Sequence, residues 1–253
     1  MLSNKKIVCP NNLIDRAKKI GLVNAAIVNA GEILPMESTH KAVQNNLINP
    51  IFIGNETEIK KHAQKLKWDI SKYKIIDEKD ENGTAPLAAK LASEGKAKII
   101  VKGHIHTEVL MKAVLKRDLN LIGKKRLSHV WHMTIDTDDK PFIITDGVLN
   151  VLPKLEVKMH ILRNAVDFAN KIGITRAKVS VLSATEEVLE SMPSSIEAQT
   201  ITKKAKKENI NADVFGPLAF DNSVSKKAAE IKKIKNEVAG NTDILLVPNV
   251  ETG

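Results

Sequence analysis

The stretch PFIITDGVLNVLPKLEVKMHILRNAVDFANKIGITRAKVSVLS, residues 141–183, decides the fold. Residues 142–145 form a short apolar run that ends at an Asp-Gly turn, as a buried parallel strand does. Between 155 and 172 the apolar residues recur every three or four positions, which predicts a long helix that stops at Gly173. Residues 178–182 predict a second buried strand. The stretch therefore predicts a right-handed βαβ unit, whose first loop lies where open α/β sheets bind ligands.

The same alternation of strands and helices extends outward in both directions. The strands expected elsewhere are residues 25–28, 51–53, 74–76, 98–101, 128–131 and 244–247. The helices expected elsewhere are residues 12–20, 37–46, 56–65, 84–94, from 108 onward, 194–208 and 225–235. Asn55 with Glu58, and Ser194 with Glu197, have the spacing of a capping box, and residues 212–222 are expected to form a loop at a strand edge. This pattern predicts an α/β fold of three αβα layers with mostly parallel sheets.

The length and composition predict two domains of moderate size. The boundary is expected just beyond the charged linker 136–140, giving an N-terminal α/β domain at 1–147 and a second α/β domain at 148–253. Cys9 is the one cysteine, so no intrachain disulfide is possible and a reducing compartment is expected. No signal peptide and no run of about eighteen apolar residues is present, which predicts a cytoplasmic protein without a membrane partner.

The charge favours anionic partners. A net charge of +9 suits nucleic acid, a membrane surface or phosphorylated small molecules. Only 3% of the residues are aromatic, and no nucleic-acid-binding module accompanies the basic charge, so we expect no nucleic-acid partner.

Three turns carry the polar residues from which a site can be built. Lys102 and Gly103 end a strand and precede a helix with Thr107 near its start, and backbone amides at such turns meet phosphates. The second turn, KRLSHVWHM, carries Lys125, Arg126, Ser128 and His129, which offer two cations, a hydroxyl and an imidazole. The third is the loop with Asp146 and Asn150. Ser183 and Asp221 also follow predicted strands, and the candidate site residues are therefore Lys102, Gly103, Thr107, Arg126, Ser128, His129, Asp146, Asn150, Ser183 and Asp221.

The histidines leave a second interpretation open. His104 lies two positions before His106, and His129 lies three before His132, so each pair could supply imidazole ligands to a metal. No carboxylate or thiolate accompanies them at a convincing spacing. We therefore expect no metal.

Six segments resemble the phosphate acetyltransferase and phosphate butyryltransferase family in order and spacing. They are VKGHIHT, KRLSHVWHM, ITDGVLNVLPKLEVKMHILRNAVDFANKIGI, VSVLSATEEVLESMPSSIEA, DVFGPLAFDNSVSKKAAEIK and DILLVPNVETG, from about residue 101 onward. The resemblance implies a two-domain fold like the isocitrate and isopropylmalate dehydrogenases, with the active site between the domains and a homodimeric assembly. It also implies transfer of an acetyl or butyryl group between coenzyme A and inorganic phosphate.

The implied chemistry suits the residue types of the three turns. Acyl phosphate and coenzyme A are both polyanions, so cations and amide donors are needed to hold them together. The resemblance implies direct attack by the coenzyme A thiolate in a ternary complex, with coenzyme A as a substrate and no separate cofactor. Ser128, His129 and Asp146 are then the expected catalytic residues, and the other candidates would bind substrate.

One departure from the family's pattern bears on activity. That pattern continues past PNVETG with further strands and a late Ser-Arg segment followed by an Asp, whereas the sequence ends at Gly253. We therefore expect a chain that is truncated at its C-terminal end relative to the family, with its catalysis in doubt. Two alternatives stay open: a metal-dependent dehydrogenase of the same fold, of the 4-hydroxythreonine phosphate type, and a non-catalytic remnant that binds coenzyme A or phosphate.

Overall fold

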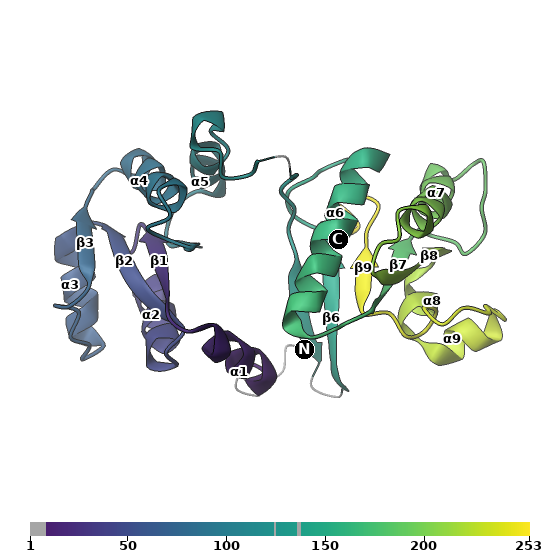
Figure 1. Ribbon diagram of the computed structural model, residues 1–253, viewed down its shortest axis with the longest axis horizontal. Helices are drawn as coiled ribbons and strands as arrows, with labels where there is room; N and C mark the ends of the chain where they lie inside the picture. Colours follow the sequence, from purple (N-terminus) through teal and green to yellow (C-terminus); the bar gives the residue numbers. More distant parts are fainter. Residues whose placement is uncertain (1–8, 124, 136–137) are drawn as a thin grey trace. The chain divides into compact units, whose positions relative to one another are not determined.

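The computed structural model describes residues 9–123, 125–135 and 138–253, which form two compact units, Met1–Gly123 and Lys124–Gly253. Each unit has its own sheet (Figure 1). The division falls earlier than the predicted boundary at 147, because strands β5 (Trp131–Ile135) and β6 (Asp138–Thr145) pair within the sheet of the second unit. The predicted linker 136–140 is only partly described: residues 136–137 lie outside the described residues, and 138–140 belong to β6.

The first unit is built on a parallel sheet in the order β3-β2-β1-β4. Its strands are β1 (Val23–Val28), β2 (Ile48–Gly54), β3 (Lys74–Asp77) and β4 (Ile99–Lys102). Its helices are α1 (Asn11–Ile20), α2 (Ile33–Gln44), α3 (Glu56–Lys65), α4 (Glu81–Ser93) and α5 (Thr107–Val114), followed by the 3-10 turn Arg117–Leu119. Ala25 and Ile27 belong to one apolar core and Ala26 and Val28 to another, so β1 buries both of its faces. This sheet therefore has a core on each side, as a three-layer fold requires.

The second unit is built on a mixed sheet in the order β5-β6-β9-β7-β8. The remaining strands are β7 (Ala177–Leu182), β8 (Ala212–Leu218) and β9 (Ile244–Leu246), and only β5 runs antiparallel to its neighbour. The helices are α6 (Leu155–Ile172), α7 (Pro193–Lys207), α8 (Phe220–Val224) and α9 (Lys226–Ile231). Figure 1 shows β9, in yellow, lying between β6 and β7. The expected α/β fold with mostly parallel sheets is confirmed.

The stretch that decided the fold forms the elements predicted for it. Strand β6 ends at Thr145, helix α6 covers the same eighteen residues that the apolar spacing marked, and β7 follows. Gly173 ends the helix in the left-handed region, with φ of 108°. Residues that α6 buries, including Met159 and Leu162, pack with Ile143 and Val179 of the sheet. The periodicity was sufficient here because the buried face is continuous.

Three local predictions need correction. Ser194 does not cap a helix: α7 begins at Pro193, whose lack of a backbone N–H suits the first helical position, and Met192 precedes it without a side-chain cap. The predicted loop 212–222 contains the edge strand β8 and the short helix α8. The strand expected to include Ser128 begins only at Trp131. The other capping residue, Asn55, was predicted correctly and accepts bonds from the N–H groups of Thr57 and Glu58.

Helix α6 forms three ion pairs with α7 and with Glu208, the residue that follows α7. Lys158 pairs with Glu197, Lys204 pairs with Glu156, and Arg163 pairs with Glu208. The Lys158 side chain is buried, with 4% of the residue exposed, whereas Glu156 keeps 75% of its side chain exposed. The first pair therefore lies inside the helix interface and the second lies on its surface.

Gly103 occupies a position where the backbone of two strands comes close. Its N–H donates to the carbonyl oxygen of Val28 at 2.8 Å, and a Cβ atom built at this residue would lie 2.3 Å from that oxygen and 2.5 Å from the carbonyl oxygen of Asn29. These neighbours are backbone atoms that pairing holds in place. Gly103 is thus required by the packing of β4 against the end of β1.

We expect the Gly103→Ala variant to lose about 1 to 3 kcal/mol of unfolding free energy, because the new methyl group overpacks against fixed backbone. Gly31→Ala is the matched control. A Cβ atom there would meet only the Cβ atom of Glu58, at an ordinary 3.4 Å. Urea denaturation measures both variants, and equal stability of the two would contradict the assignment of a packing role to Gly103.

Candidate active site

Four parallel strands of the second unit end at one edge of its sheet. The loops that leave β6, β7, β8 and β9 therefore share this edge, called here the carboxyl edge. The antiparallel β5 starts at the same edge, because Trp131 pairs with Ile144. The residues just before Trp131 are consequently brought beside the loop that begins at Asp146.

Asp146 is the centre of this loop. It is buried, with 2% exposed. Its Oδ1 accepts bonds from the N–H groups of Val148 and Leu149, both at 3.0 Å, and its Oδ2 accepts one from the side-chain amide of Asn150 at 2.6 Å. Burial raises the pKa of Asp146, but hydrogen bonds from Leu149, Asn150, Val148 and the backbone of His129 outweigh it and hold the pKa below its usual value. The group is therefore a carboxylate acceptor at neutral pH.

Three side chains hold the segment that carries Arg126, Ser128 and His129. Asn164 donates to the carbonyl oxygen of Arg126 at 2.8 Å, Asn150 donates to that of Leu127 at 3.1 Å, and Thr145 donates to that of His129 at 2.7 Å. These donors lie on α6, in the β6 loop and at the end of β6, respectively. The segment is thus fixed against the carboxyl edge without being part of a strand.

The side chains of this segment are available for a ligand. The His129 ring packs edge-on against Trp131, with ring centroids 4.7 Å apart, and its Nδ1 is buried with no hydrogen-bond partner among the described residues. Ser128 is half-buried, and Arg126 is exposed. The structure therefore brings together five predicted residues: Arg126, Ser128, His129, Asp146 and Asn150. We call these five the edge cluster.

Ser183 and Asp221 lie at the same edge but outside the edge cluster. Strand β9 separates β6 from β7, which places the ends of β6 and β7 about 10 Å apart. The Ser183 hydroxyl bonds to that of Ser194 at 2.9 Å and to Met192 Sδ at 3.3 Å, so it closes its own loop. Asp221 is exposed, and its carboxylate accepts from the N–H of Asn222. These contacts give both residues a local structural role.

The remaining candidates belong to the first unit. Lys102 ends β4, and Thr107 is the first residue of α5; both are exposed. His106 lies between these two residues in the sequence. Glu81, at the start of α4, accepts hydrogen bonds from the backbone N–H of His106 and from its Nδ1, the latter at 2.8 Å. The bonds from His106 lower the pKa of Glu81. Lys102 and Thr107 therefore lie at the carboxyl edge of the first sheet, where an open α/β sheet also binds ligands.

Two polar residues of the second unit, one half-buried and one buried, were not predicted from the sequence. Asn164 bonds both to the Arg126 carbonyl and to the Ser128 hydroxyl, although it is 36 to 38 positions away. Asn222, 1% exposed, donates to Glu186 at 3.3 Å, and its Oδ1 lacks a partner among the described residues. The only feature of the sequence that pointed to Asn222 was its position next to the predicted site residue Asp221. No signal marked Asn164, because an Asn within a helix is ordinarily read as exposed.

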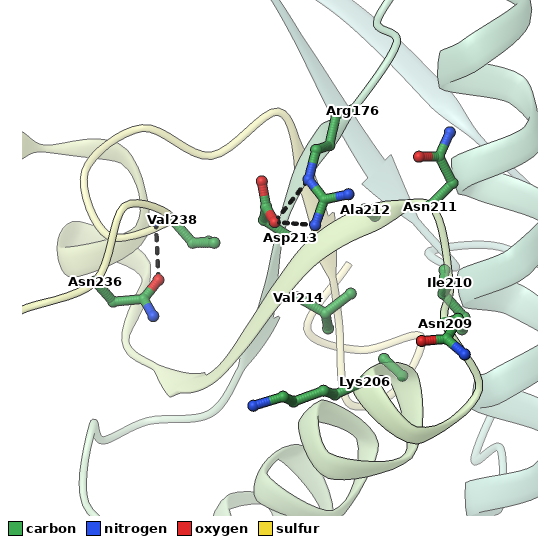
Figure 2. Close-up of a pocket in the computed structure, with 11 residues that line it drawn as sticks. Arg176, Lys206, Asn209, Ile210, Asn211, Ala212, Asp213, Val214, Asn236 and Val238 are labelled. Carbon is green, nitrogen blue, oxygen red and sulfur yellow. Dashed lines mark hydrogen bonds and ion pairs between the residues drawn. The ribbon is translucent and has the colours of Figure 1, made fainter.

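A cavity of about 390 Å³ lies at the opposite end of the second sheet. Figure 2 shows Arg176 and Asp213 side by side in its lining, joined by bonds of 2.9 and 2.7 Å from the guanidinium group to Oδ1 of the carboxylate. Asp213 raises the pKa of Arg176 further. Arg176 and Ala212 stand at the amino-terminal ends of β7 and β8, and none of the ten candidate site residues lines the cavity. This region provides control positions for tests of the carboxyl edge.

The histidine pairs do not form a recognisable metal centre in the described part of the chain. His104 and His106 belong to the first unit, and His129 and His132 to the second. His132 packs against Phe168, with ring centroids 6.4 Å apart. Among the described residues, no three His, Cys, Asp or Glu side chains are grouped as metal ligands would be.

The fold and the edge cluster define an α/β protein with a polar site at the carboxyl ends of parallel strands. The phosphate acetyl/butaryl transferase family matches residues 81–253. The phosphate acetyltransferase of Rickettsia prowazekii is 38% identical over 96% of this chain and 70% of that protein. The phosphate butyryltransferase of Clostridium acetobutylicum is 33% identical over 96% of this chain and 81% of that protein. The chain therefore belongs to the phosphate acetyl/butaryl transferase family, as the resemblance predicted.

Solved structures agree with this assignment. The branched-chain phosphotransacylase from Enterococcus faecalis V583 superimposes with a TM-score of 0.78 and 30% identity, covering 91% of this chain and 81% of that one. A 4-hydroxythreonine-4-phosphate dehydrogenase from Burkholderia phymatum has a TM-score of 0.52 and 13% identity, over 90% of this chain and 79% of that one. The second likeness concerns the fold alone. Within the residues that the structure describes, no helix has the length and apolar character needed to cross a bilayer.

Proposed function

We propose that the protein transfers an acetyl or butyryl group between coenzyme A and inorganic phosphate, with the edge cluster as the reacting part of its site. The observation that carries the proposal is the fixation of Arg126, Ser128 and His129 beside Asp146 by three side-chain hydrogen bonds to backbone carbonyls. Family membership supports the reaction class. The geometry supports the location of the site at the carboxyl edge of the second sheet, because convergent polar groups at such an edge usually bind the ligand in open α/β sheets.

The proposed reaction joins two anionic substrates without a protein nucleophile. The thiol of coenzyme A loses its proton to a base, the thiolate attacks the acyl carbon, a carbon–sulfur bond forms, and the carbon–oxygen bond to phosphate breaks. Coenzyme A enters as a substrate, and no further cofactor is invoked. The role of the protein is then to align the reactants and to stabilise the charge that develops on the carbonyl oxygen.

We assign the base role to His129 and a positioning role to Asp146. Imidazole is the side chain best suited to exchange a proton near neutral pH. The carboxylate of Asp146 is already used by at least three donors, and its lowered pKa makes it a weak base. Asp146 instead orders the loop and, through Asn150, the backbone that carries Ser128.

The cationic and hydroxyl groups supply the binding of phosphate. Arg126 is exposed beside the edge cluster and provides a planar set of donors that matches phosphate oxygens. Ser128 provides a hydroxyl on the same segment.

The test is phosphate-dependent release of free thiol from acetyl-CoA and from butyryl-CoA. We expect turnover by the unaltered chain and a loss of about a hundredfold or more in kcat for His129→Asn, which removes the base but keeps a polar side chain. Arg176→Ala, at the opposite end of the sheet, is the control and is expected to keep full activity. Full activity of the His129 variant would overturn the assigned role, and absence of turnover in the unaltered chain would overturn the proposed function.

A further inference from the structure

The side-chain amide of Asn164 donates two hydrogen bonds to the edge cluster. One reaches the carbonyl oxygen of Arg126 at 2.8 Å, and the other reaches the Oγ of Ser128 at 2.9 Å. A carbonyl oxygen can only accept, so the NH₂ group of the amide, and not its oxygen, must face this segment. Each of the two amide hydrogens then has one acceptor. The network therefore fixes Asn164 as the donor and Ser128 as the acceptor.

This arrangement determines what the Ser128 hydroxyl can still do. A hydroxyl has one hydrogen, and because its oxygen accepts from Asn164, that hydrogen must point to another acceptor. Among the described residues no side chain or backbone carbonyl takes it. Ser128 is half-buried at the carboxyl edge and next but one to the exposed Arg126. Its O–H is thus left as a donor on the side where a ligand would bind.

We propose that Asn164 is a positioning residue, which commits the Ser128 hydroxyl to donating a hydrogen bond to a phosphoryl oxygen of bound phosphate or acyl phosphate. This inference rests on the proposed function and extends it to a residue of α6. A phosphate oxygen without a proton can only accept, so a hydroxyl fixed as a donor favours it over a group that itself donates. Arg126 supplies the accompanying positive charge.

Two replacements of Asn164 distinguish its effect on the direction of the Ser128 O–H group from its support of the backbone at Arg126. Asn164→Asp keeps the size of the side chain but replaces both donors with acceptors, so Ser128 would turn its hydrogen toward residue 164 and away from the ligand. Asn164→Ala removes the bond to the Arg126 carbonyl but leaves the Ser128 hydroxyl free to rotate toward the ligand. If Asn164 only supports the segment, the two variants should behave alike.

The measured quantity is the affinity for inorganic phosphate, obtained by calorimetry with and without coenzyme A, together with KM for phosphate. We expect Ser128→Ala and Asn164→Asp each to weaken phosphate binding by about ten- to a hundredfold. Adding Ser128→Ala to Asn164→Asp should cost nothing more, whereas adding it to Asn164→Ala should still cost about tenfold. Circular dichroism establishes that each variant is folded.

A matched variant accounts for the added negative charge. Gln199→Glu, on α7, introduces the same charge and retains an acceptor for Lys203, which Gln199 now contacts at 2.8 Å. It is expected to leave phosphate affinity unchanged. If repulsion alone weakened binding in Asn164→Asp, Ser128→Ala would weaken it further in that background, and the inference would be overturned.

The outcomes also separate this inference from the proposed function. Phosphate binding that follows the expected pattern without acyl transfer would support the role of Asn164 and contradict the function. The proposal that Asn164 positions the Ser128 hydroxyl would be overturned if Asn164→Ala and Asn164→Asp weakened phosphate binding equally and Ser128→Ala had no further effect in either variant. An unaltered chain that binds no phosphate at millimolar concentration would also overturn it.

Discussion

The Asp146→Asn variant is expected to lose about 3 kcal/mol of unfolding free energy at pH 7, on the scale of one to two hydrogen bonds to a buried charge. Both carboxylate oxygens of the native residue accept bonds, from Val148, Leu149 and Asn150. An amide must direct its NH₂ group at one of these sets of donors. At least one buried donor is then left without a partner, in a site with only 2% exposure.

The pH dependence of this loss follows from the direction of the pKa shift. The hydrogen bonds keep the folded-state pKa of Asp146 below its value in the unfolded chain, near 3.9. Its stabilising contribution is therefore complete above that value and disappears as the pH falls through the folded-state pKa. The difference between native protein and variant should be full at pH 7 and small in acid. Denaturant titrations at pH 7, 5 and 3 measure it, and a difference that widens in acid would contradict the argument.

Asp213→Asn is the matched control for Asp146→Asn. It removes a carboxylate from the same sheet, but from a pair with Arg176 in which the two side chains keep 35% and 60% of their area exposed. Solvent screens such a pair, so only a slight loss of stability is expected. A control that lost as much as Asp146→Asn would show that removal of charge, and not of the buried acceptor, is responsible.

The Glu197→Gln variant is expected to lose about 3 to 5 kcal/mol, the usual cost of leaving one member of a buried ion pair without its partner. Lys158 is 4% exposed and pairs with Glu197, which keeps 26% of its side chain exposed. Replacing the carboxylate leaves the ammonium group of Lys158 inside the interface of α6 and α7. Thermal and chemical denaturation measure the loss.

Two further variants test this explanation. Lys158→Met together with Glu197→Gln removes the unpaired charge and should recover most of the lost stability, because an apolar side chain of similar length suits the buried position. Glu156→Gln interrupts the exposed pair with Lys204 on the same two helices and should leave the unfolding midpoint almost unchanged. Failure of the double variant to recover would show that Lys158 is not the source of the cost.

Much of the fold was predictable because burial imposes a period on the sequence. Helix α6 was predicted with its correct ends, since its apolar residues follow one face and Gly173 terminates it. The prediction was wrong where two local signals competed: Ser194 has the spacing of a capping residue, but Pro193 already begins the helix. Strand β5 was extended too far because Ser128 and His129 alternate with apolar neighbours, although side chains and not a strand partner hold them.

The candidate site residues that could be named from the sequence stand in turns next to predicted strands. Asp146 and Asn150 stand in the loop after β6, and Arg126, Ser128 and His129 are placed beside them by the antiparallel pairing of β5. Asn164 was missed because its partners lie 36 to 38 residues away, and only the packing of α6 on the sheet creates the contact. Ser183 also follows a strand, and its hydroxyl bonds to that of Ser194 within its own loop.

The central place of β9 has a consequence for the growing chain on the ribosome. Residue 143 of β6 pairs with residue 244 of β9, so the partner of β6 is synthesised 101 residues later. At about 5 to 20 residues per second, this corresponds to roughly 5 to 20 seconds. During that interval β6, and β7 once it has been synthesised, present an apolar strand edge that native pairing has not yet covered, and such edges can pair with other nascent chains. Overexpression at low temperature, or with chaperones that shield these edges, should therefore increase the yield of folded protein.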